Sequence, residues 1–136
     1  MERREQARSF RDLIVWQRAH ELVLAVYRST KDFPKKEAYA LTSQFRRTVV
    51  SVAANIAEGF KKKSAREKIR FYNISQGSLS EVEYYTILSQ DLTYGKMEWI
   101  EEKVAEVGRL LESYIKTIKL KTNQNASPDF QLLTST

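Results

Sequence analysis

The chain has 136 residues, 42% of them hydrophobic and 29% charged, and a formal net charge of +6, which is typical of one soluble domain with a hydrophobic core. It has no cysteine, which excludes disulfides, thiolate metal sites and thiol nucleophiles. No apolar run reaches the roughly 18 residues of a membrane span, and the polar start MERREQARSF does not resemble a signal peptide, so we expect a cytoplasmic protein with no membrane contact.

With only two prolines and four glycines, the chain should form a few long helices. The first is expected from about Leu13 to Lys31, with Asp12 as its N-cap, and Phe33-Pro34 should stop it because the residue before proline avoids the helical region. The second should begin at Glu37 or Thr42 and end near Phe60.

A third helix is predicted from about Ser64 to Thr93, opened by the capping box Ser64-Ala65-Arg66-Glu67 and ended by Gly95. A fourth is predicted from about Met97 to Lys121. Its seam of apolar residues alternates steps of three and four throughout.

Short connections make consecutive helices antiparallel neighbours, so the predicted fold is all-α, an up-down-up-down four-helix bundle over residues 12–121. Residues 1–11 form a basic N-terminal arm, and residues 122–136 lose all periodicity and are expected to be a flexible tail. The third helix is apolar over much of its circumference, which indicates coverage by a second subunit and hence oligomerisation.

Two parallel stripes run along the second helix. The apolar stripe predicts a bundle core and contains Phe45, Val49, Val52, Ile56 and Phe60. The polar stripe contains Gln44, Thr48, Ser51, Asn55 and Glu58. Since buried polar groups must find partners, the polar stripe predicts a specific contact with another helix, and the small pair Gly77-Ser78 of the third helix should allow that close approach.

Several segments resemble the four-helix-bundle proteins encoded in 23S ribosomal RNA intervening sequences. They are FRDLIVWQRAHEL, FPKKEAYALTSQFRR, NIAEGF and FYNISQGSLSEVE, and the similarity spans about residues 10 to 120. The NIAEG and GSLSE segments are its most specific parts.

The resemblance implies a left-handed up-down bundle that assembles as a homopentamer and is not an enzyme. A more distant group comprises the accessory proteins of diversity-generating retroelements, basic pentamers that bind nucleic acid and a reverse transcriptase. The family's polar positions fall on Gln44, Arg47, Asn55, Glu58, Ser78 and Glu81, to which the stripe adds Ser51 as a member of a structural polar network.

The up-down topology gathers basic residues at one end of the bundle, called here the basic pole. Residues 58–70 carry six basic and two acidic side chains, residues 1–12 carry four and three, and residues 112–121 carry three and one. The charges of residues 28–37 and 91–103, at the other end, sum to zero. The candidate nucleic-acid-binding residues are Arg8, Arg11, Lys61, Lys62, Lys63, Arg66, Lys68, Arg70, Lys116, Lys119 and Lys121.

Lysines after a helix C-terminus complement the helix dipole, so part of this charge has a structural or solubilising explanation. That explanation does not cover Arg66, Lys68 and Arg70, which lie in the opening turns of the third helix. Phosphates would offset their repulsion, with release of counterions. No base-reading motif is visible, so any binding of RNA or DNA should depend on backbone charge or shape.

An enzymatic function has little support, and we expect no cofactor and no bound metal. His20 is the only histidine and lacks the Glu-x-x-His partners of di-iron bundles.

Two alternatives to nucleic-acid binding remain. One is a protein-interaction scaffold such as a reverse-transcriptase accessory protein, and the other is a small hydrolase or nuclease that uses Glu58 and Glu81 as a carboxylate pair.

Overall fold

The computed structural model describes residues 6–123. Within this range there are four α-helices, α1 (Ile14–Thr30), α2 (Leu41–Lys61), α3 (Ala65–Asp91) and α4 (Glu98–Asn123), and two short 3-10 helices, η1 (Phe10–Asp12) and η2 (Lys35–Glu37). No strand occurs in residues 6–123. The all-α class and the four helices are therefore confirmed, with helix ends within about two residues of those predicted for most helices.

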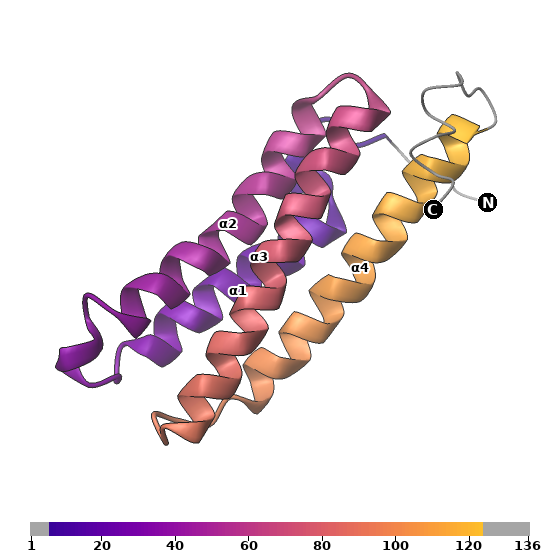
Figure 1. Ribbon diagram of the computed structural model, residues 1–136. Helices are drawn as coiled ribbons and strands as arrows, with labels where there is room; N and C mark the ends of the chain where they lie inside the picture. Colours follow the sequence, from indigo (N-terminus) through magenta and orange to yellow (C-terminus); the bar gives the residue numbers. More distant parts are fainter. Residues whose placement is uncertain (1–5, 124–136) are drawn as a thin grey trace.

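The helices form one bundle in which the chain reverses direction at each short connection (Figure 1). Helix α1 contacts α2 and α4, and α3 contacts the same two helices. The α2–α3 pair has the most extensive contact, and its connection, residues 62–64, is also the shortest.

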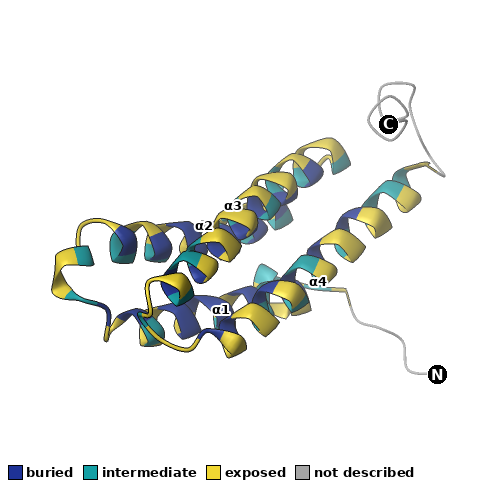
Figure 2. Cartoon of the chain, turned by 60° about the horizontal axis from the view of Figure 1, so that its bottom comes forward, coloured by how far each residue is buried: buried dark blue, intermediate teal, exposed yellow. Residues whose placement is uncertain are grey.

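The core lies between the four helices, and the buried positions face inward on each of them (Figure 2). The apolar seam of α2 is buried from Phe45 to Ile56, with Phe60 half-buried at its end. The seam of α4 is buried from Ile100 to Leu111, and Met97, directly before the helix, is buried with it. These are the faces that the heptad-like spacing predicted.

The start of α1 differs from the prediction. Its N-cap is Leu13, which offers no side-chain cap. Asp12 instead accepts hydrogen bonds from the backbone N–H groups of Arg8 and Ser9, at 2.9 and 3.2 Å, and Ser9 completes this capping box around η1. The part of the N-terminal arm from Gln6 onward therefore has a defined conformation, and η1 packs on α1 and α2.

Helix α3 ends at Asp91, before the predicted stop at Gly95. The backbone of Thr93 takes the left-handed conformation at φ 61°, and the N–H of Tyr94 returns to the carbonyl of Ser89 at 2.9 Å. This is the Schellman pattern, in which the left-handed position is usually glycine. The expected flexible tail lies outside the described residues apart from Thr122 and Asn123, which continue α4.

Candidate nucleic-acid interface

Three segments carry the candidate basic residues, and they lie at one end of the bundle: the stretch leading into η1, the α2–α3 connection, and the last turns of α4 (Figure 1). The final turns of α4 stand apart from the α2–α3 connection in both views (Figures 1 and 2). The basic pole is therefore divided into two cation-bearing projections at the same end of the molecule.

The side chain of Lys68 forms hydrogen bonds within the protein. Its Nζ donates to the carbonyl of Phe60 at 2.6 Å and to that of Gly59 at 3.4 Å, so it satisfies acceptors that the end of α2 leaves free. Partial burial lowers the pKa of Lys68. A cation in the first turns of α3 thus has a structural role that sequence reasoning missed.

Two further cations pack on an aromatic ring. Lys62 Nζ and Arg70 Cζ each lie 5.0 Å from the centroid of the Phe71 ring. Arg70 also lies 3.8 Å from the Glu67 carboxylate. The backbone N–H of Glu67 donates to Ser64 Oγ at 3.1 Å. The predicted capping box is incomplete, because the Glu67 side chain does not accept a hydrogen bond from the backbone N–H of Ser64.

The remaining candidates have side chains with no hydrogen bond, ion pair or cation–π contact among residues 6–123. All are exposed except Lys119, which is half-buried. They are Arg8, Arg11, Lys61, Lys63, Arg66, Lys116, Lys119 and Lys121. These eight side chains are the ones available to an anionic partner.

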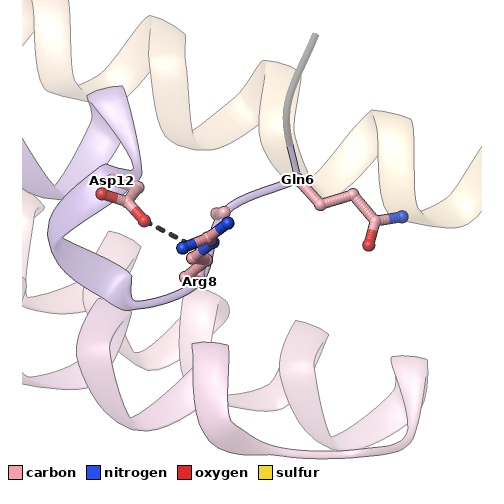
Figure 3. A pocket seen from close by; sticks show the side chains of 4 residues that line it. Gln6, Arg8 and Asp12 are labelled. Carbon is pink, nitrogen blue, oxygen red and sulfur yellow. Dashed lines mark hydrogen bonds between the residues drawn. The ribbon is translucent and has the colours of Figure 1, made fainter.

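A depression of about 410 Å³ lies beside the N-terminal segment, lined by Gln6, Ala7, Arg8 and Asp12 (Figure 3). Asp12 accepts its hydrogen bond from the Arg8 backbone here, while the Gln6 side chain points away from that pair. The described part of the lining offers one carboxylate, Asp12, and no second carboxylate or histidine with which it could share general acid–base chemistry.

The predicted polar network forms only at its centre. Ser51 and Ser78 join α2 to α3 through a 2.8 Å hydrogen bond between their hydroxyls, and Asn55 donates to Ser51 Oγ at 3.0 Å. Ser75 adds a bond to the carbonyl of Val52 at 2.8 Å, a contact that sequence reasoning missed.

The outer members are not brought into this network. Gln44, Arg47, Glu58 and Glu81 are exposed and have no side-chain partner among the described residues. Each of the four occupies a solvent-facing position of α2 or α3.

The prediction that another helix of the same chain approaches closely at Gly77 is also wrong, since nothing lies within 4 Å of a Cβ placed there. The close contact occurs at Gly59, where such a Cβ would lie 2.7 Å from Tyr72 Cε1. Glycine in the NIAEG segment is thus explained by the packing of the Tyr72 ring.

Glu58 and Glu81 do not form a carboxylate pair. The Ser51–Ser78 bond sets the register of α2 against α3, and the two glutamates lie on opposite sides of that level. At 1.5 Å of rise per residue they are separated by roughly 15 Å along the bundle axis. This spacing is too long for the joint acid–base chemistry of the hydrolase alternative.

His20 is exposed and stacks on Trp16, with ring centroids 5.0 Å apart. Within residues 6–123 no group of histidine and acidic side chains is arranged to hold a metal ion. None of the described helices is long and apolar enough to cross a membrane.

Taken together, the fold and the candidate site define a four-helix-bundle protein with a cation-rich end. The model of the 23S rRNA-intervening sequence protein family matches residues 11–113, and the chain belongs to this family. A solved structure of a protein of unknown function, from the S23 ribosomal protein family of Bacteroides thetaiotaomicron VPI-5482, is similar to it with a TM-score of 0.68 and 25% identity, over 76% of this chain and 96% of that one. No curated protein matches the chain significantly.

Proposed function

We propose that this protein is a non-enzymatic homo-oligomer that binds RNA or another nucleic acid through its basic pole. The observation that carries the proposal is the set of exposed cations at one end of the bundle that have no partner among the described residues. Such cations bind phosphates with release of counterions. The intramolecular roles of Lys62, Lys68 and Arg70 reduce the set but leave eight candidates, of which all but Lys119 are exposed.

Support for oligomerisation comes from α3. Its outward side exposes Ile74, Tyr84 and Ile87, at 42%, 58% and 47% of their maximal accessible areas, and the exposed Gly77 lies among them. An apolar face of this kind on a bundle helix fits a second copy. The family resemblance favours five subunits, which would present several basic poles together if the subunits share one polarity.

The test is a titration of labelled RNA at about 50 and 200 mM salt, a range over which phosphate-driven binding weakens steeply. The triple variant Lys61→Ser, Lys63→Ser, Arg66→Ser should lose at least about tenfold in affinity and up to about three units of salt slope. Lys62, Lys68 and Arg70 are left intact so that the α2–α3 connection keeps its structure.

The matched control is Lys31→Ser, Lys35→Ser, Lys36→Ser, which removes three exposed cations from the opposite end. Its affinity should stay close to that of the unchanged protein. Equal losses in both triple variants would mean that net charge, and not the basic pole, governs binding.

A protein-interaction scaffold is the second candidate, favoured by Tyr39 in the α1–α2 connection, which is 99% exposed. Exposed tyrosines are frequent anchors of protein interfaces. This function predicts that nucleic acid binds tightly only when a protein partner, for example a reverse transcriptase, is present.

A further inference from the structure

The aromatic side chains near the basic pole are already engaged within the protein. Lys68 Nζ lies 5.3 Å from the centroid of the Phe60 ring, and Lys62 and Arg70 both lie at 5.0 Å from that of Phe71. Both phenylalanines are only half-exposed. Neither ring therefore offers a free face on which a base could stack.

The other aromatics at this end are equally occupied. Tyr72 is fully buried and meets the half-buried Tyr114 edge to face, with centroids 5.2 Å apart. Trp16 is covered on one face by His20 and contacted by Phe10 at 5.0 Å. The described part of the basic pole thus has cations without a stacking platform.

The exposed aromatics are found elsewhere. Among the phenylalanine, tyrosine and tryptophan side chains of residues 6–123, those with large exposed areas are Tyr27, Tyr39, Tyr84 and Trp99. Tyr27 lies near the end of α1, Tyr39 follows η2, and Trp99 lies at the start of α4, all at the end opposite the basic pole. Tyr84 lies in the half of α3 nearer that opposite end.

The cations of the α2–α3 connection are also held on a fixed support. Ser64 caps α3, and Lys68 ties the first turns of α3 to the last carbonyls of α2. Lys61, Lys63 and Arg66 project from this support, and all three are exposed. A backbone held in this way presents its three cations from fixed positions, which suits a ligand whose phosphates are regularly spaced.

These observations separate two classes of nucleic acid. Proteins that bind single strands combine a positive groove with aromatic side chains on which bases stack. Duplex RNA is bound mainly through its shape and its phosphates and hydroxyls, without access to base faces. We infer that the basic pole binds double-stranded nucleic acid through its phosphate backbone, in preference to single strands; this inference rests on the proposed function.

The experiment compares a labelled RNA duplex with an unstructured single strand of the same length, at one salt concentration. The duplex should bind at least tenfold more tightly, and the triple variant Lys61→Ser, Lys63→Ser, Arg66→Ser should lose that binding. A single strand bound as tightly as the duplex would overturn the duplex preference and leave the proposed function intact. Absence of binding to both RNAs would overturn the proposed function itself.

A second variant tests the aromatic argument directly. Phe71→Leu keeps an apolar side chain at the α2–α3 contact but removes the ring, and it should leave duplex affinity within about twofold. A selective loss of single-strand binding in this variant would show that bases stack on Phe71, and would contradict the inference.

Discussion

At Gly59 a side chain of α3 occupies the space that a Cβ on α2 would need. The Tyr72 ring packs over it, and the Tyr72 side chain is fully buried. Its hydroxyl has no hydrogen-bond partner in the described structure, and burial raises the pKa of Tyr72. Close packing against Gly59 therefore fixes the position of this ring.

We predict that Gly59→Ala destabilises the protein. The added Cβ would lie 2.7 Å from Tyr72 Cε1 and 3.1 Å from Phe71 Cβ, and the buried ring has little room to move. Overpacking costs about 1–3 kcal/mol, and alanine's better helix propensity returns about 1 kcal/mol. Urea unfolding at fixed protein concentration should show a net loss of up to about 2 kcal/mol.

Gly77→Ala is the matched control, since it adds the same methyl group to a helix with open space around it. Where no second subunit covers Gly77, it should raise the free energy of unfolding by up to about 1 kcal/mol. If Gly77→Ala were as destabilising as Gly59→Ala, another subunit must pack directly on Gly77.

The two glycines also show what the sequence can and cannot predict at this scale. The spacing of the apolar seam placed Phe45, Val49, Val52 and Ile56 correctly in the core. It did not show which glycine meets an aromatic ring, because that depends on the register of α2 against α3. The carbonyl-capping role of Lys68 was hidden for the same reason.

At the scale of elements, α1 and α4 are joined by four alternating charges. Lys103 Nζ lies 2.6 Å from Glu21 Oε1, and Arg18 lies 2.9 Å from Glu21 and 3.5 Å from Glu106. Lys103 closes the arrangement with Glu106 at 3.5 Å. Each charge thus has two opposite charges as neighbours.

This arrangement makes stability depend on pH. The hydrogen bond from Lys103 and the charges of Lys103 and Arg18 outweigh desolvation and lower the pKa of Glu21 below its ordinary value of 4.5. A lowered carboxyl pKa contributes stability that is complete above the ordinary pKa and is lost as pH falls through the folded-state pKa.

Glu21→Gln should therefore lower stability at pH 7, by less than about 1 kcal/mol because the Glu21 side chain is 41% exposed and exposed ion pairs contribute little. The difference from the unchanged protein should vanish in strong acid. Thermal unfolding of both proteins from pH 3 to pH 7 measures this difference in stability, because that range contains the ordinary carboxyl pKa. Glu102→Gln, at an exposed position of α4, should show no such difference, and a pH-independent gap for Glu21→Gln would exclude this origin.

Helix bounds were predictable because caps, proline and periodicity are local signals. The α1–α4 ion pairs were not, since they join residues about 85 positions apart in sequence. The turn at Thr93 was not predicted because threonine rarely adopts the left-handed backbone conformation. The end of α3 was therefore assigned to the nearby Gly95.

At the scale of the whole molecule, alternating helix direction explains why cations far apart in sequence share one end. This followed from short connections alone. The sequence could not show that the end of α4 stands apart from the α2–α3 connection, or that Lys62, Lys68 and Arg70 are engaged internally. Both depend on side-chain contacts that periodicity does not encode.

The outward face of α3 leads to the last prediction. Assembly through this face would cover the exposed rings and aliphatic groups of Ile74, Tyr84 and Ile87, whereas an isolated chain leaves them in water. We expect the unchanged protein to be a homo-oligomer by size-exclusion chromatography with light scattering. Tyr84→Lys, which places a charge within this face, should reduce the measured mass toward that of one 15.9 kDa chain.

Ser113→Lys introduces the same charge at an exposed position of α4 and should leave the mass unchanged. Circular dichroism of both variants should retain full helicity, because neither position belongs to the core. A Tyr84→Lys protein that remains assembled would place the subunit contact on another face, and an unchanged protein that is monomeric would refute oligomerisation. RNA affinity measured on the dissociated variant then separates the contribution of one basic pole from that of several poles held together, because linked sites bind a common ligand more tightly than a single site does.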